Sequence, residues 1–135
     1  MRKYITSLVF IGVVMADTSA SELLCGNAKN TVEETQCLSA ELEKTNTNLA
    51  DYLAVAKERI ARENSGKPQL DAAQAAWLQY RSAQCGDVYT YWQAGTYRYR
   101  ADLECGIELT RSRTHDIWKA YLTYFGTTPP LRPEP

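Results

Sequence analysis

The chain has 135 residues, with 15 Lys and Arg against 16 Asp and Glu, which gives a formal net charge of -1. This length allows one domain, and hydrophobic and charged fractions of 44% and 23% exclude a largely disordered chain. The charge balance provides no basic excess for phosphate binding, so we expect no nucleic-acid partner. One His, four Cys and seven Gly also disfavour most cofactor-binding folds, and no cofactor is expected.

The first residues have the pattern of an export signal. Arg2 and Lys3 supply the positive start, and residues 8–15 form an apolar run that is too short to span a bilayer. Small residues near the end of this segment predict cleavage after Ala20, with Ala16 as a second position. We therefore expect a periplasmic or secreted protein, with no membrane insertion after the signal is removed.

Four cysteines follow the predicted signal: Cys25, Cys37, Cys85 and Cys105. In an oxidising compartment an even number of thiols persists as disulfides, and the wide spacing of these thiols disfavours a metal site. Lipidation of Cys25 is an alternative, but lipoprotein processing requires a smaller residue than Leu24 before the cysteine. Of three possible connectivities we favour Cys25–Cys37 and Cys85–Cys105, because each pair brackets a segment that is otherwise poorly tied down.

Helical signals begin at Thr31, which we interpret as an N-cap followed by acidic residues in the first turn. A short first helix is expected to end near Leu38. Apolar residues then recur at spacings typical of a long amphipathic second helix that ends near Asn64. They are Leu38, Leu42, Leu49, Leu53, Ala56 and Ile60. Asn, Ser, Gly and Pro within residues 64–68 predict the tight turn of a helical hairpin.

The second half of the chain contains two further helical patterns. Apolar spacing predicts a third helix over 70–86, ended by Gly86, and a fourth helix over 103–125. Residues 87–99 are rich in Tyr and Trp without a sustained repeat, so we interpret them as a loop or irregular arm. Prolines end regular structure after the fourth helix, and the tail is expected to be frayed. The predicted fold class is all-α: a small disulfide-tied helical bundle built from antiparallel helical hairpins.

One face of the third predicted helix combines an amide, an indole, a guanidinium and a thiol. The four residues fall within a sector of roughly 80 degrees and should point inward together. They are Gln74, Trp77, Arg81 and Cys85. We interpret this set as structural, because a half-buried Arg on a helix is more often paired than catalytic. An acid such as Asp116 or Glu104 is the expected partner of Arg81.

These residues, together with three that follow them, resemble the Q-W-R-C and C-T-R signature of small secreted bacterial proteins related to the N-terminal domain of LprI, a lysozyme inhibitor. The three are Cys105, Thr110 and Arg113. The first half of the chain is similar to the same family at Cys25, Glu33, Cys37, Leu42 and Leu49. The second helix departs from the family pattern of Asp, Leu-Asn and Tyr, because this chain has Asn46, Leu49, Ala50 and Leu53 there.

The resemblance implies an exported, all-helical domain whose founding activity is inhibition of lysozyme. It divides the chain into a signal peptide over 1–20, an LprI-like helical domain over 21–126 and a Pro-rich tail over 127–135. In the family signature, Gln74, Trp77, Arg81, Thr110 and Arg113 are interpreted as structural residues.

The sequence does not predict an enzyme. A nucleophile needs a base and a group that orients the base, yet all thiols are expected in disulfides and His115 is the single His. Its neighbour Asp116 points in a different direction on a helix. Glu104 and Glu108 are spaced as paired carboxylates, but a solvated helix face explains them without a pocket. We therefore expect no catalytic residues.

The arm over 87–99 is the best candidate for recognition. Tyr, Trp and Arg are enriched at binding hot spots. The candidate partner-binding residues are Tyr89, Tyr91, Trp92, Tyr97 and Arg98. A competing interpretation is that the same rings fold back to cap a small core.

The main functional hypothesis is a binding protein that blocks a peptidoglycan-cleaving enzyme, a lysozyme or a related muramidase, by protein–protein contact. Host lysozymes are basic, so a mildly acidic inhibitor is steered toward them while Tyr97 or Arg98 enters the catalytic cleft. Two alternatives stay open: a periplasmic structural or envelope-assembly factor, and an immunity protein against a secreted muramidase toxin.

Overall fold

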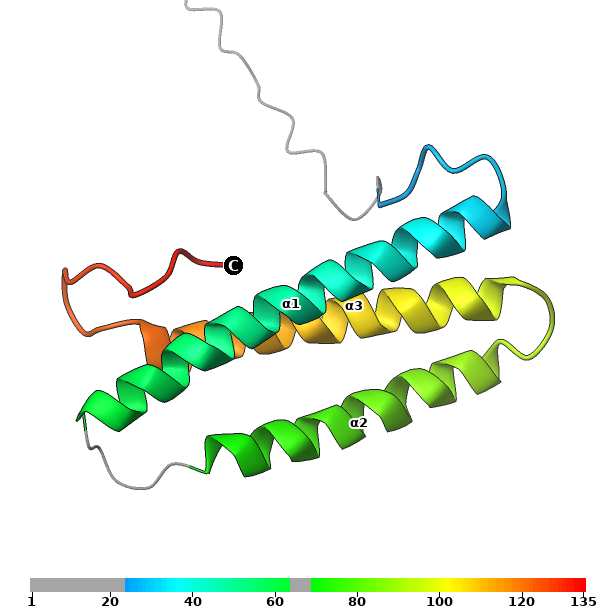
Figure 1. The fold of residues 1–135 in the computed structure, drawn as a ribbon. Helices are drawn as coiled ribbons and strands as arrows, with labels where there is room; N and C mark the ends of the chain where they lie inside the picture. Colours follow the sequence, from blue (N-terminus) through cyan, green and yellow to red (C-terminus); the bar gives the residue numbers. More distant parts are fainter. Residues whose placement is uncertain (1–23, 64–68) are drawn as a thin grey trace, which may run out of the picture.

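The computed structural model describes residues 24–63 and 69–135, which form three α-helices and one π-helical turn. The elements are α1 (Thr31–Glu63), α2 (Leu70–Tyr91), α3 (Tyr97–Ile117) and η1 (Trp118–Leu122). Successive helices run in opposite directions, and α3 lies between α1 and α2 (Figure 1). The described residues contain no strand, and the predicted all-α, disulfide-tied fold is confirmed. The predicted signal peptide and the turn over 64–68 lie outside the described residues.

Helix α1 is one continuous helix, so the predicted break near Leu38 is wrong. Its 33 residues contain no Gly or Pro, and Leu38 is fully buried within a single inward-facing row. The N-cap is Asn30 rather than Thr31, because the Asn30 side-chain oxygen accepts from the backbone N–H groups of the next turn at 2.9 and 3.0 Å. The Glu33 carboxylate completes this cap by accepting from the Lys29 N–H at 2.9 Å.

Helix α2 passes through Gly86 and ends at Tyr91, so the predicted helix end at Gly86 is wrong. Glycine in a helix interior costs only about 1 kcal/mol relative to Ala, and the disulfide at the adjacent Cys85 holds the helix there. Helix α3 begins at Tyr97. The irregular arm expected over 87–99 is therefore a short connection between two helix ends that carry most of the aromatic residues.

The main apolar cluster lies at the end of the bundle away from the α2–α3 connection, and we call this the core end. Its buried members come from every helix and from η1: Leu49, Tyr52, Ala56, Leu70, Ile117 and Leu122. Leu131 of the tail packs against them. The Tyr52 hydroxyl donates to the Pro133 carbonyl at 2.8 Å, and the Trp118 indole N–H donates to the Arg132 carbonyl at 2.9 Å. The tail is thus docked on the bundle, and the expectation of a frayed tail is wrong.

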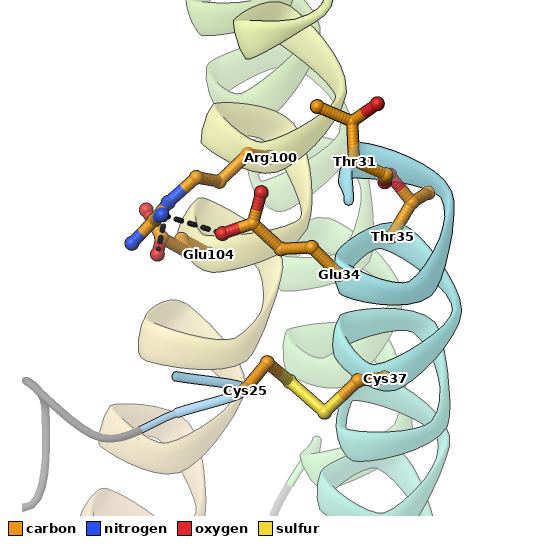
Figure 2. A network of polar contacts seen from close by, with 7 residues as sticks. All are labelled: Cys25, Thr31, Glu34, Thr35, Cys37, Arg100 and Glu104. Carbon is orange, nitrogen blue, oxygen red and sulfur yellow. Dashed lines mark hydrogen bonds and ion pairs between the residues drawn. A yellow bond between two sulfur atoms is a disulfide. The ribbon is translucent and has the colours of Figure 1, made fainter. Parts of the chain in front are cut away.

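The opposite end is the turn end, where two disulfides and an ion-pair network tie the elements together. The disulfides have the favoured local connectivity, Cys25–Cys37 and Cys85–Cys105. Figure 2 shows Arg100 of α3 between two carboxylates: its guanidinium lies 2.6 Å from Glu34 of α1 and 2.9 Å from Glu104 of α3. These contacts join the first turns of α1 to α3, next to the disulfide that holds the segment before α1.

Candidate recognition site

The family signature residues meet where α2 packs on α3. One guanidinium nitrogen of Arg81, Nη1, donates to the Asn46 side-chain oxygen and to the Thr110 hydroxyl, each at 2.7 Å. Burial lowers the pKa of Arg81. The expectation that an acid pairs with Arg81 is wrong, because both acceptors of its hydrogen bonds are neutral side chains. Glu104, one of the acids expected there, pairs with Arg100 instead. Asn46, one of the departures from the family pattern, thus supplies the contact from α1.

Trp77 lies at the centre of the same cluster. Its half-buried ring is flanked by the guanidinium carbons of Arg81 at 5.0 Å and Arg113 at 6.0 Å from the ring centroid. Arg113 Nε also donates to the Gln74 side-chain oxygen at 3.1 Å. Gln74, Trp77, Arg81, Thr110 and Arg113 therefore contact one another in one continuous cluster that holds α2 on α3.

Three of the candidate recognition residues form an exposed group, which we call the outer aromatic cluster: Tyr91, Trp92 and Tyr97. The Trp92 ring centroid lies 5.3 Å from that of Tyr91 and 4.7 Å from that of Tyr97, both in edge-on geometry. Their exposed fractions are 77% for Tyr91, 43% for Trp92 and 47% for Tyr97. Side chains of this size are rarely left so open in a group unless they contact something.

The other two candidates, Tyr89 and Arg98, lie apart from that cluster and contact Tyr99. The Arg98 guanidinium carbon lies 4.9 Å from the Tyr89 ring centroid and 5.0 Å from the Tyr99 centroid, and Arg98 donates to the Tyr99 hydroxyl at 3.1 Å. This hydrogen bond raises the pKa of Arg98 and lowers the pKa of Tyr99. Arg98 is turned back onto its own chain, which leaves Tyr97 as the more accessible of the two residues proposed to enter a cleft.

A groove of about 540 Å³ continues from the outer aromatic cluster along the α2–α3 seam. One wall is a row of α2 residues spaced by four, Tyr80, Gln84, Val88 and Trp92. Tyr97, Ala101, Cys105 and Leu109 form the facing row of α3, with Glu104 and Glu108 along its rim. Tyr80 and Glu108 were not predicted as groove residues. The i, i+4 spacing from Tyr80 to Trp92 is the signal that would have connected them, because α2 continues past Gly86.

The histidine and the acidic residues outside this seam lie as follows. His115 Nε2 lies 3.1 Å from a Glu134 carboxylate oxygen on the surface. Residues 24–63 and 69–135 hold no group of three or more His, Cys, Asp or Glu side chains positioned to share a metal ion. Within the same ranges no helix is both long and apolar enough to cross a membrane.

The fold is that of a small all-helical protein with two disulfides and a cluster of exposed aromatic side chains at the turn end. The family model described as lysozyme inhibitor LprI matches residues 25–117, and the chain belongs to this family. The predicted family resemblance is thus confirmed. Searches of curated proteins and of solved structures gave no match. The family is one of inhibitors, which agrees with the expectation of a binding protein rather than an enzyme.

Proposed function

We propose that this protein is an exported inhibitor that blocks a lysozyme or a related muramidase by protein–protein contact, with the outer aromatic cluster as the contact surface. The observation that carries this proposal is the joint exposure of Tyr91, Trp92 and Tyr97 in a chain that belongs to a lysozyme inhibitor family. Trp and Tyr dominate the energetics of protein interfaces because they bury a large area at low entropic cost.

The location of these rings supports a role in contact rather than in folding. None of the three is buried, and the main apolar cluster lies at the other end of the bundle. The Cys85–Cys105 disulfide fixes the two helices just below the connection, with Cα atoms 5.6 Å apart. A rigid support lowers the entropy lost when a surface binds, so the cluster is presented in a preorganised form.

Charge and disulfides agree with the proposed setting. Loss of Arg2, Lys3 and Asp17 with the predicted signal would leave 13 basic and 15 acidic residues, a formal charge of -2. An acidic inhibitor associates faster with a basic lysozyme because long-range attraction steers the encounter. Both disulfides fit an oxidising compartment such as the periplasm or the exterior.

The test is inhibition of muralytic activity by the purified chain without residues 1–20. Replacing Trp92 and Tyr97 together with Ala should weaken inhibition about thirtyfold, the effect of losing a central hot spot of about 2 kcal/mol. Phe125→Ala is the matched control, because Phe125 is fully exposed and lies outside this cluster. Circular dichroism must show unchanged helicity. Full inhibition by the folded double variant would contradict the proposed surface, and absence of inhibition by the wild type would contradict the function.

A further inference from the structure

The groove along the α2–α3 seam has two kinds of wall. Trp92 and Tyr97 line the part next to the α2–α3 connection. Tyr80, which is 52% exposed, lines the opposite part, about three helical turns away along the same row of α2 and on the side where Glu108 of α3 lies. The floor is closed by the buried Ala101 and by the Cys85–Cys105 disulfide. An aliphatic chain that lies beside Tyr80 would therefore contact apolar atoms of both helices.

The charge of the groove is of one sign. Its lining includes the carboxylates of Glu104 and Glu108 and contains no Lys or Arg. Glu104 already accepts from Arg100, which also pairs with Glu34. Glu108 is exposed, and no ion pair to it forms within the described part of the chain. The nearby Arg111 is held by Glu41 at 2.6 Å. One carboxylate at the rim is therefore available to a partner.

Aromatic faces beside an available carboxylate are complementary to a cation carried on an aliphatic stem. Resting on the proposed function, we infer that this groove receives one Arg or Lys side chain of the target enzyme. The stem packs between the α2 and α3 rows next to Tyr80, and the cationic head pairs with Glu108. Contact at the outer aromatic cluster and capture of the cation then form one continuous interface, in which the pair with Glu108 selects basic enzymes.

The groove itself is tested with small probes that do not depend on lysozyme. The peptide acetyl-Gly-Arg-Gly-amide is titrated into the chain without residues 1–20, and acetyl-Gly-citrulline-Gly-amide serves as its uncharged counterpart. The readout is the ring carbon–proton signal of Tyr80 in NMR spectra of the aromatic region, assigned with Tyr80→Phe. The Arg peptide should shift this signal and the citrulline peptide should not. Glu108→Gln should reduce the shift several-fold, whereas Glu58→Gln, an exposed carboxylate on α1 outside the groove, should leave it unchanged.

Three results would overturn the inference: no shift with the Arg peptide, equal shifts with both peptides, or a shift that survives Glu108→Gln. A tetramer of β-1,4-linked N-acetylglucosamine is the third probe. A response to this sugar alone would identify a glycan groove and would likewise overturn it.

The enzyme assay separates this inference from the proposed function. Glu108→Gln should weaken inhibition of a c-type lysozyme about tenfold at low salt and flatten its salt dependence, because a screened charge pair is lost. If the wild type does not inhibit, the proposed function fails, and the peptide titration still decides whether the groove binds cations. If the wild type inhibits and the peptide titration fails, the function stands and the cation groove is rejected.

Discussion

The core end and the turn end of this bundle are held together by different forces. At the core end, apolar side chains from all the helices and the tail are removed from water around Ile117 and Leu122. At the turn end, the helices are tied by the Cys85–Cys105 disulfide and by ion pairs around Arg100, while large aromatic rings stay exposed. The difference shows how a small domain can leave large aromatic rings uncovered: covalent and polar ties add to the limited burial around Leu38 and Ala101.

The largest expected effect on stability comes from truncating one side chain at the core end, compared with one at the turn end. Ile117→Ala should lower the free energy of unfolding by about 3 to 4 kcal/mol, because the side chain is only 1% exposed and its removal leaves a cavity. Tyr97→Ala at the turn end should cost less than about 1 kcal/mol. Urea denaturation followed by circular dichroism measures both values, and equal losses would contradict the division into two ends.

Removing the Cys85–Cys105 disulfide should have the next largest effect. Replacing both cysteines with Ala should cost about 3 kcal/mol, on the model in which a cross-link restricts the unfolded chain. The loss should be local: hydrogen exchange should accelerate in the last turns of α2 and the first turns of α3, while amides near Leu122 keep their relative protection. The matched variant lacking Cys25 and Cys37 should accelerate exchange near the start of α1 instead. A uniform increase in either variant would show that the ends are not independent.

Between the two ends, the polar cluster should contribute a smaller amount. Thr110→Val removes a fully buried hydroxyl that accepts from Arg81 and leaves that charged donor short of a partner, at a cost of about 2 kcal/mol. Thr114→Val is the control, because the Thr114 hydroxyl only donates to the Thr110 carbonyl one turn earlier. It should change stability by less than about 1 kcal/mol. Similar urea midpoints for the two variants would show that the contact with Arg81 does not stabilise α2.

The smallest effect is a pH dependence at the turn end. Burial raises the pKa of Asp102 above its ordinary value of 3.8, so the folded chain binds this proton more tightly than the unfolded chain. The resulting stabilisation is present below that ordinary value and is lost as the pH rises through the folded-state pKa. Asp102→Asn should therefore raise Tm at pH 7 and have little effect at pH 3. The exposed Asp87→Asn is the control, and a higher Tm at pH 3 alone would reverse the assigned sign.

The fold was largely predictable because its signals are local. The apolar row through Leu49 and Ala56 and the even number of cysteines specify helices and disulfides without knowledge of tertiary contacts. The predicted end of the helix at Gly86 was wrong because the modest cost of glycine in a helix is outweighed by the adjacent Cys85–Cys105 disulfide. That disulfide connects two helices and is not a local signal. The docked tail was missed for a similar reason, since the partner of Pro133 is Tyr52.

The candidate recognition residues can be named from the sequence, but their arrangement cannot. Aromatic residues are evident where α2 ends and α3 begins, yet the sequence does not distinguish Tyr97, which is exposed, from Arg98, which stacks on Tyr89 and Tyr99. The role of Glu108 at the rim of a groove depends on which faces of α2 and α3 meet. The exposure of Tyr97 and the position of Glu108 depend on how the helices pack, and no pattern within one helix predicts them.

The docking of the tail also makes residues beyond the last helix part of the stabilising structure. Leu131 packs on the cluster that contains Leu122, and the Pro133 carbonyl accepts from the Tyr52 hydroxyl. Displacing this segment would uncover apolar surface of α1 and η1 at the core end. A change in the tail, although it lies far from the aromatic rings, is therefore a change in the hydrophobic core.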